Sequence, residues 1–481
     1  MRVLLIMPDY PDNNGFGPQA SIILPPLGLE YLAANIEDIA DVCILDERLK
    51  DTNLKSIENK IDTFKPDYVG ISSNYSFQIY KALKIAKIAK EHGSQTILGG
   101  WHPTLAFSET LNSEFVDIVV RGEGENTLRE LIKNNSPIGI KGLSYKNNGK
   151  QIHNPDRELM NLKNLKFPAR HLRSKEAKRA YNFFGIPVES IETSRGCPFS
   201  CNFCCIHHFY KESYRQRRIQ EIILELKLVD IKNRASIIYI VDDNFVVNKK
   251  FTLDLCDALI KYGINKYFMS QARVDMVVNH PVIFKKMADA GFIFLFLGLE
   301  SFSDRTLIKL NKRIKFEEIK SAIKILHDLG YIIQGNVILA ADLQDREQDL
   351  KSTIEIASTL DVDIPTFSLL TPFPGTKLME QVIEEDLLLT RDWRKFNWTA
   401  PTIKYQHLSP DDLNIYLKKA YKEVGFHPKE GFKRLIQIRG LKFHIKRTIN
   451  QAMFTGITMM IKTLAQELSN MFNKNSNKKL D

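Results

Sequence analysis

Three cysteines in one short segment have the clearest chemistry in this 481-residue chain. Cys197, Cys201 and Cys204 follow a C-x3-C-x2-C spacing. Thiolates are soft ligands that suit iron–sulfur clusters and zinc. Three of them in one loop can hold three irons of a four-iron cluster and leave the fourth iron open to a substrate. The spacing therefore favours a cluster over zinc.

A zinc site would need a fourth ligand from the same segment. The candidates are Cys205, His207 and His208. Cys205 directly follows Cys204, so we expect its side chain to point elsewhere, as a loop or wall thiol. Cys43 and Cys256 fall in strand and helix patterns and are expected in the core. Cysteines used as ligands rather than as a disulfide framework predict a reducing, cytoplasmic compartment.

The cysteine motif directly follows the first strand of an alternating series, which predicts a partial parallel (β/α)6 barrel over residues 188–385. The predicted strands are 188–193, 237–241, 267–271, 293–299, 332–339 and 366–370. The predicted helices between them are 219–232, 249–261, 281–289, 316–329 and 348–359. Active sites of such barrels lie at the carboxyl ends of the strands. Polar residues at those ends are Asp242, Asp243, Gln271, Arg273, Glu300 and Ser301.

Residues 1–135 show a similar alternation and predict an α/β, Rossmann-like (flavodoxin-like) domain with a parallel sheet covered on both faces. Its predicted strands are 3–7, 42–45, 68–72, 96–98 and 118–120, with helices at 80–91 and 125–133. Ligands of such sheets bind beyond the carboxyl ends of the strands. The residues there include Ser72, Ser73, Gly99, Gly100 and His102.

Two further regions complete the predicted organisation. Residues 136–187 lose the alternation and are expected to be a linker, and the basic run 170–179 within them is expected to be a solvated face. Residues 386–481 are predicted to be helical. No apolar stretch is long enough to span a membrane, and the first residues predict a buried strand rather than a secretory signal.

The net charge of +10 is concentrated at the C-terminus. Residues 428–481 hold 11 Lys and Arg against 3 Asp and Glu, so the other 427 residues carry only +2. This distribution argues against a nucleic-acid-binding body. The tail has apolar residues at helical spacing among its basic ones. It would either lie on an anionic membrane or pack on the barrel.

The motifs in their order resemble the cobalamin-binding branch of the radical S-adenosylmethionine enzymes over roughly residues 1–385. The cysteine motif is the specific element. The other matches are individually weak, but they occur at successive strand ends: Asp242-Asp243-Asn244-Phe245, Gln271-Ala272-Arg273, Gly298-Leu299-Glu300-Ser301 and Thr371-Pro372-Phe373-Pro374-Gly375-Thr376.

The resemblance implies that the three cysteines bind a 4Fe-4S cluster. S-adenosylmethionine would chelate the open iron and be cleaved to a 5′-deoxyadenosyl radical. The residues implied to bind S-adenosylmethionine are Phe203, Asp242, Asp243, Gln271, Arg273, Glu300 and Ser301. Each polar one is equally explained as a strand-end group satisfied by the backbone, and Phe203 as an aromatic that shields the cluster. Asp242 and Asp243 replace the glycine-rich segment of many relatives and could also cap a helix.

The resemblance also implies cobalamin in the N-terminal domain. The implied binding residues are Ser72, Ser73, Gly99, Gly100, His102, Thr104, Gly122 and Glu123. The Asp-x-His-x-x-Gly signature is absent, so cobalamin would lack a histidine ligand from that motif, or the domain no longer binds it. His102 is expected to be a loop or structural contact. Ala340-Ala341-Asp342, where many relatives carry glycines, would remodel the substrate side.

The implied activity is methylation of an unactivated carbon in an apolar substrate of lipid, isoprenoid or tetrapyrrole type. The alternatives are ring formation or carbon–carbon coupling on a lipid or tetrapyrrole, and a non-catalytic corrinoid or iron–sulfur sensor. Radical methylthiolation is disfavoured, because the N-terminal domain has a single cysteine, Cys43. The expected partners are an electron donor such as flavodoxin or ferredoxin and, through residues 428–481, the cytoplasmic face of a membrane. No nucleic acid is expected.

Overall fold

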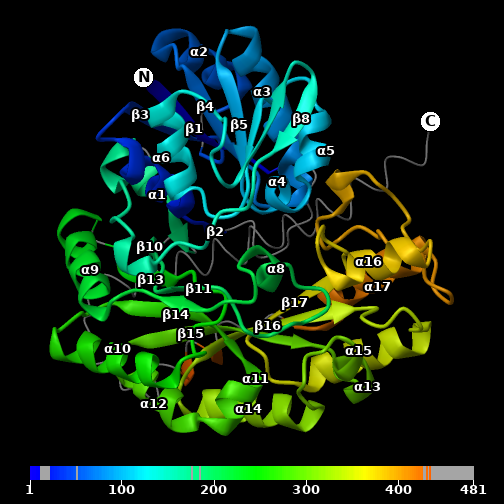
Figure 1. The fold of residues 1–481 in the computed structure, drawn as a ribbon. Helices are drawn as coiled ribbons and strands as arrows, with labels where there is room; N and C mark the ends of the chain where they lie inside the picture. Colours follow the sequence, from blue (N-terminus) through cyan, green and yellow to red (C-terminus); the bar gives the residue numbers. More distant parts are fainter. Residues whose placement is uncertain are drawn as a thin grey trace.

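The computed structural model describes residues 1–10, 22–49, 52–174, 177–183, 186–233, 235–425, 430–431 and 433–434. An N-terminal α/β domain lies against one end of a larger α/β sheet that is backed by helices (Figure 1). The predicted tail lies outside the described residues from position 435 onward. Within the described part of the chain, no helix is long and apolar enough to cross a membrane.

The N-terminal domain is built on a seven-stranded sheet with the order β3-β1-β4-β5-β6-β7-β8. Helices α1 and α6 cover one face, and α2 and α3 cover the other. The five predicted strands are confirmed as the parallel part of the sheet. The bounds are β1 Arg2–Met7, β3 Asp41–Asp46, β4 Tyr68–Ser72, β5 Gln95–Gly99, β6 Ile118–Val120, α1 Leu27–Ile36, α2 Leu54–Phe64, α3 Ile79–Glu91, α4 Trp101–Leu105, α5 Phe107–Asn112 and α6 Glu125–Asn134.

The N-terminal sheet continues past residue 135 into the expected linker. Strands β7 (Leu143–Asn147) and β8 (Lys150–His153) form an antiparallel hairpin on β6. Asn148 and Gly149 form its turn with φ of 49° and 78°. Asn-Gly is typical of such a two-residue turn, because both positions need positive φ. The residues that led us to predict a linker between the domains therefore form the turn of a hairpin.

The barrel sheet has the order β17-β16-β15-β14-β13-β10-β9-β2, and its first six strands run parallel. All six predicted strands and all five predicted helices are present, and α11 and α13 are additional. The bounds are β10 Ile186–Ile191, β13 Ile237–Ile240, β14 Tyr267–Arg273, β15 Phe292–Glu300, β16 Ile332–Leu339, β17 Ile364–Leu369, α9 Ile219–Asn233, α10 Lys249–Lys261, α11 Val274–Asn279, α12 Pro281–Asp289, α13 Asp304–Lys309, α14 Phe316–Asp328 and α15 Glu347–Thr359.

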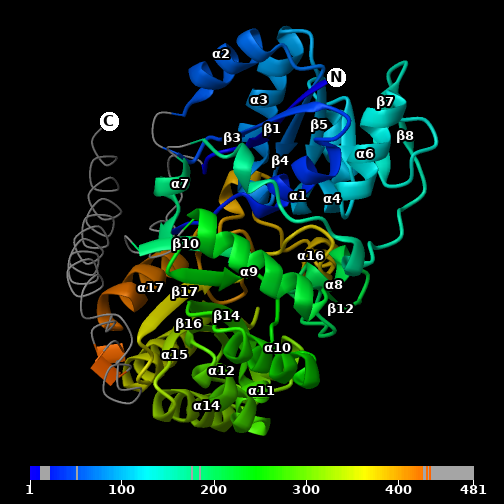
Figure 2. The same cartoon turned by 90° about the vertical axis from the view of Figure 1, so that its left-hand side faces the viewer.

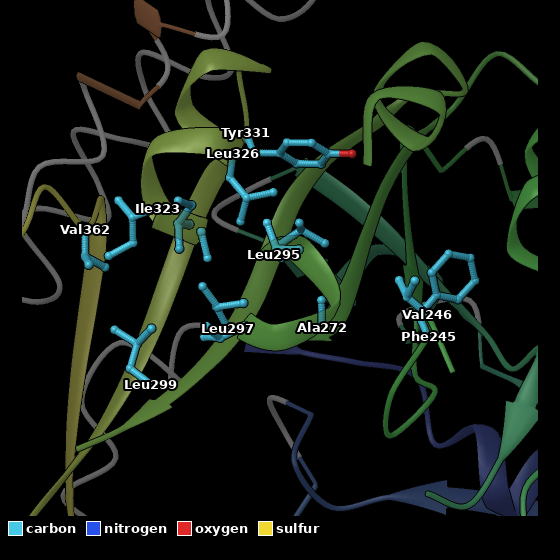
Figure 3. Packing of buried hydrophobic residues seen from close by; sticks show 14 of the residues in the cluster. Phe245, Val246, Ala272, Leu295, Leu297, Leu299, Ile323, Leu326, Tyr331 and Val362 are labelled. Carbon is cyan, nitrogen blue, oxygen red and sulfur yellow. The ribbon is translucent and has the colours of Figure 1, made fainter. Parts of the chain in front are cut away.

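A large apolar core joins this sheet to its helices (Figure 3). Leu295, Leu297 and Leu299 alternate along β15 toward the helices, where they pack with Leu326 and Tyr331. Two short strands, β9 (Asn182–Phe183) and β2 (Ile22–Ile23), extend the sheet beyond β10. Since β2 comes from the N-terminal part of the chain, it ties the two domains together. The C-terminal part adds α16 (Lys377–Glu384), η5 (Trp393–Lys395) and α17 (Pro410–Glu423).

The basic run that begins at Arg170 is not a solvated face at its start. Arg173 is buried and forms ion pairs with Glu30 of α1 and Glu189 of β10. Arg170 pairs with Glu225 of α9 at 2.6 Å. The prediction was wrong for these two arginines, because their partners come from three distant segments that meet only in the fold. This network lies where α9 and β10 face the N-terminal domain (Figure 2).

Candidate functional site

The cysteine loop begins at a short ribbon in which β11 (Ser194–Arg195) pairs with β12 (Arg215–Gln216). Gly196 follows with φ of 90°, and a Cβ there would lie 2.1 Å from the carbonyl oxygen of Ser213. Only glycine fits such a contact at a positive φ. The amide of Gly196 donates to Asp243 Oδ2 at 3.2 Å, and the amide of Cys204 donates to the carbonyl of Cys201 at 3.1 Å. The loop is therefore fixed through its backbone.

The three predicted ligand thiols form one group within this loop. Cys201 interacts electrostatically with both Cys197 and Cys204. Burial raises the pKa values of the Cys197 and Cys204 thiols above their ordinary range. A soft cation must therefore displace protons from these thiols when it binds. Nearby, the Arg273 guanidinium lies 3.8 Å from Cys201 Sγ and 3.8 Å from the centroid of the Phe199 ring.

The donor set suits a four-iron cluster, because cysteine thiolates are the usual ligands of such clusters. Among the described residues, no three His, Cys, Asp or Glu side chains converge as the ligands of one metal ion would. A four-iron cluster places each thiolate on a different iron, so it needs no such convergence. The side chain of Cys205 is mostly buried, and burial raises its thiol pKa to about 12. His207 and His208 pack ring to ring with centroids 3.9 Å apart.

At the ends of β14 and β15, three buried residues are linked through one backbone carbonyl and one ion pair. Arg273 donates to the carbonyl of Lys312 at 2.7 Å, and Lys312 Nζ lies 2.7 Å from Glu300 Oε1. Glu300 has φ of 61°, a strained value for a side chain of its size. Ser301 Oγ accepts from the amide of Ser303 at 3.2 Å. Lys312 belongs to this group although no motif in the sequence pointed to it.

Asp242, Asp243 and Gln271 lie outside this group of charged residues, and Asp243 stays close to the ligand thiols. Both carboxylate oxygens of Asp242 accept hydrogen bonds from Thr193 and Ser194, so this residue fastens the start of the cysteine loop. Burial raises the Asp243 pKa to about 7. Gln271 Nε2 donates to the Tyr239 hydroxyl at 3.2 Å on the inner face of the barrel.

Phe203 lies in a different environment from the polar candidates. Its ring packs on an apolar cluster beside β16 and α16, with members that include Leu310, Ile338, Leu370 and Leu378. The side chain therefore forms part of the wall on the α16 side of the cysteine loop.

A cavity of about 230 Å³ opens between the N-terminal sheet and barrel residues that flank the cysteine loop. Five of the eight predicted cobalamin residues line it, namely Ser72, Gly99, Gly100, Gly122 and Glu123. Gly100 has φ of 103°, and a Cβ there would lie 2.7 Å from Asn74 Oδ1, so the loop approaches closely. The barrel contributes Glu192, Arg195, Phe209, Tyr210 and Val241 to the same cavity. No pattern along the chain indicated this second set.

The remaining three predicted cobalamin residues do not line the cavity. His102 is buried with Nδ1 2.9 Å from Ser76 Oγ, and burial lowers its pKa to about 4, so the ring is neutral at pH 7. Thr104 Oγ1 accepts from the amide of Gly122 at 3.0 Å, and Ser73 Oγ donates to the carbonyl of Tyr75 at 3.3 Å. These three side chains therefore support the loops that line the cavity.

Comparisons with known proteins agree with this arrangement. Residues 191–356 match the Radical SAM superfamily, and residues 19–132 match the B12 binding domain. The chain is 34% identical to the uncharacterized methyltransferase PH0819 of Pyrococcus horikoshii, over 93% of this chain and 97% of that protein. The chain belongs to the cobalamin-binding radical S-adenosylmethionine family. It is an enzyme whose cofactors are a 4Fe-4S cluster, S-adenosylmethionine and cobalamin.

Other relatives include methylases and cyclases. It is 29% identical to the hopanoid C-3 methylase of Methylococcus capsulatus, over 78% of this chain and 71% of that protein. It is 27% identical to the anaerobic magnesium-protoporphyrin IX monomethyl ester cyclase of Rubrivivax gelatinosus, over 89% and 79%. The fold matches the cobalamin-dependent radical enzyme OxsB with a TM-score of 0.70 at 19% identity, over 98% of this chain and 81% of that one.

Proposed function

We propose that this radical S-adenosylmethionine enzyme is a cobalamin-dependent methylase that acts on an unactivated carbon of an apolar substrate held between the two domains. When bound, the three cofactors supply a carbon-centred radical and a transferable methyl group. The observation that carries the proposal is the cavity between the B12-binding sheet and the residues that flank the cysteine loop, because methyl transfer needs both cofactors at one substrate.

The cysteine loop and the strand ends beside it would hold the cluster and S-adenosylmethionine. We assign the three irons to Cys197, Cys201 and Cys204. Arg273 and Glu300, which line up with Lys312 beside Cys201, are the candidates for the charged methionyl group. Glycines at 99 and 122 line the cavity and have no side chain, so a flat macrocycle could lie close to the backbone there.

A group of aromatic rings between the domains, which we call the aromatic wall, supports the proposal that the substrate is apolar. Tyr75 and Phe77 stack with centroids 5.1 Å apart, and Trp398 meets Tyr75 edge-on at 5.5 Å. Phe373 packs on Trp398 at 5.2 Å. These rings come from the β4–α3 loop, the segment after β17 and the C-terminal region. Although the ring of Tyr75 makes these contacts, 38% of the residue is still exposed, so it offers apolar surface to a ligand.

Tyr75 of this wall has a neighbour in the barrel, Tyr239 of β13. Burial and the neighbouring hydroxyls of Tyr10 and Tyr239 raise the pKa of Tyr75. Tyr239 of β13 accepts a hydrogen bond from Gln271 of β14, so Tyr75 would lie on the side of the strand ends where the radical would form. A substrate on this wall would have to cover the exposed part of Tyr75, because radical chemistry requires that water be excluded.

The proposal is tested with anaerobically reconstituted protein, a chemical reductant and S-adenosylmethionine. We expect cluster absorbance and release of 5′-deoxyadenosine. Cys204→Ala should abolish both, because one iron loses its ligand. Cys256→Ala is the matched control, because Cys256 is a buried core thiol on α10 and both signals should persist. A full cluster without any 5′-deoxyadenosine would instead favour the sensor alternative.

The reaction type is tested by product mass. Methylation adds one carbon, whereas ring closure removes two hydrogens, and a hopanoid and a magnesium porphyrin ester are suitable first substrates because relatives act on such compounds. In the cell we propose flavodoxin or ferredoxin as the electron donor. A product that has lost two hydrogens would replace the methylase proposal with a cyclase.

A further inference from the structure

Two arginines of the β11–β12 ribbon join the cysteine loop to the N-terminal domain. Arg195 and Arg215 lie opposite each other in the register of the ribbon. Both reach Glu123, a cavity residue in the loop between β6 and α6. Arg195 Nη1 lies 2.8 Å from Glu123 Oε1, and Arg215 Nη1 lies 2.9 Å from Oε2. One carboxylate of the N-terminal domain is therefore held by both strands of the ribbon.

All three nitrogens of the Arg195 guanidinium form ion pairs. Besides Glu123, its Nη2 lies 2.6 Å from Glu125, the first residue of α6, and its Nε lies 2.9 Å from Glu192 at the end of β10. The Arg195 side chain is 6% exposed. A planar fork that donates to three carboxylates in fixed directions is a task for arginine, and lysine cannot reproduce it.

If the backbone of Arg195 moves, the positions of the cluster ligands must change as well. Arg195 is two residues before Cys197, and Gly196 between them is held against the Ser213 carbonyl and Asp243. On the other side, Glu123 also accepts from the amide of Met160 at 2.7 Å. The link is therefore constrained at both ends.

A ligand in the cavity would touch this link directly. Glu123, Glu125, Glu192 and Arg195 all line the 230 Å³ cavity that we assign to cobalamin. A ligand there restrains the same guanidinium that sets the start of the cysteine loop. Two sites that restrain one shared group bind with a coupling free energy, and the coupling is reciprocal.

We propose that Arg195 is a positioning residue that couples cobalamin binding to cluster binding, so that each cofactor strengthens the hold on the other. This inference rests on the proposed function, because it needs both cofactors at the assigned sites. It goes beyond that function by assigning a cooperative order to their loading. The cluster-loaded protein should bind cobalamin on the order of tenfold more tightly than the cluster-free protein.

The test measures cobalamin affinity by equilibrium dialysis of radiolabelled cobalamin, with and without the reconstituted cluster and without S-adenosylmethionine. In the wild type we expect the ratio of the two dissociation constants to be about ten. In Arg195→Gln the ratio should fall to near one, and in Arg195→Lys it should fall most of the way. Glu125→Gln, which removes one partner and keeps the shape, should reduce the ratio by a smaller factor and carries the test if Arg195→Gln does not fold.

The matched control is Arg173→Gln. Arg173 is equally buried and joins the same two domains through Glu30 and Glu189, but it does not touch the cysteine loop. This variant should weaken the interface and keep the tenfold ratio. A wild-type ratio of one, an unchanged ratio in Arg195→Gln, or an equal loss in Arg173→Gln would overturn the coupling and leave the proposed function intact. Wild-type protein that takes up neither cofactor would overturn the proposed function itself.

Discussion

At the scale of single residues, burial sets the protonation of the groups around the cysteine loop. Burial raises the pKa of Glu192 from 4.5 to about 7 even though it pairs with Arg195 at 2.9 Å. Its neighbours Glu123 and Glu125 compete for the same guanidinium. The negative charges of Asp242 and Glu125 add to the effect of burial on Glu192, and a proton on Glu192 relieves this repulsion.

The raised pKa of Glu192 gives a pH dependence of stability. The folded protein binds this proton more tightly than the unfolded chain, so the stabilisation is complete below pH 4.5 and is lost as the pH rises through 7. We expect the free energy of unfolding of the cofactor-free wild type to fall between pH 5 and 7.5 by about 2 kcal/mol relative to Glu192→Gln. Urea denaturation at the two pH values measures this difference.

Glu317→Gln is the control for this experiment, because Glu317 lies exposed on α14 with a side chain 78% accessible. Its stability difference from the wild type should be the same at both pH values. If wild type and Glu192→Gln instead lose stability in parallel, the proton on Glu192 plays no part in folding.

The functional residues could be predicted from the sequence where they belong to one short motif. They could not be predicted where their interaction partners are distant in the sequence. The sequence indicated Cys197 to Cys204 and the glycine loops of the cavity. Nothing in it connected Arg195 with Glu123 and Glu125, because a salt bridge leaves no pattern along the chain. For the same reason Asp242 could be interpreted as a ligand, while the fold uses both of its oxygens to hold Thr193 and Ser194.

At the scale of elements, the strands and helices were predictable because their periodicity is local. Every parallel strand of both sheets was expected from its β-branched run, and α10 and α12 have the predicted bounds. The β7–β8 hairpin was missed because Asn147-Asn148-Gly149 fits both a linker and a tight turn. Which of the two forms depends on whether a sheet edge is available to receive the strands, and the β6 edge is a tertiary feature.

The short β11–β12 ribbon depends on one glycine. Gly196→Ala would place a Cβ 2.1 Å from the Ser213 carbonyl at a φ of 90°. The ribbon or the loop must then shift, so we expect a loss of about 3 kcal/mol in the free energy of unfolding and less iron bound after reconstitution. Both are measured on the same preparation, by denaturation and by iron analysis.

Gly263→Ala is the control that distinguishes backbone strain at a positive φ from a steric clash of the added Cβ. Gly263 has φ of 62°, and a Cβ added there would meet nothing within 4 Å, so alanine should cost only about 1 kcal/mol and leave the iron content unchanged. Equal effects of the two substitutions would show that the Ser213 contact does not constrain the cysteine loop.

At the scale of the whole molecule, two buried ionic networks hold the domains in one arrangement. One joins Arg173 to Glu30 and Glu189, and the other joins Arg195 to Glu123 and Glu125. Breaking a buried pair from one side costs about 3 to 5 kcal/mol, so the domains do not separate freely. The arrangement keeps the cavity and the cysteine loop facing each other, which the charge pattern of the sequence could not reveal.

The C-terminal tail carries most of the net positive charge of the chain, and the two domains are close to neutral. Arg434 ends the described part of the chain and pairs with Asp361 and Asp363 at 2.9 and 3.0 Å, at the start of β17 and away from the cysteine loop. Residues 435–481 carry 8 Lys and Arg against 2 Asp and Glu. A chain cut after Arg434 therefore keeps this anchor and loses most of the basic charge.

We expect that truncation to weaken binding to vesicles with anionic lipid at least tenfold, because each basic residue near such a surface contributes about 1 kcal/mol. Uncoupled cleavage of S-adenosylmethionine should persist, since the cysteine loop is untouched. Cosedimentation with anionic vesicles measures the first effect, and neutral vesicles, which neither chain should bind strongly, are the control. Equal cosedimentation of both chains would assign the tail to packing on the barrel instead, and the apolar substrate would then have to reach the aromatic wall without help from residues 435–481.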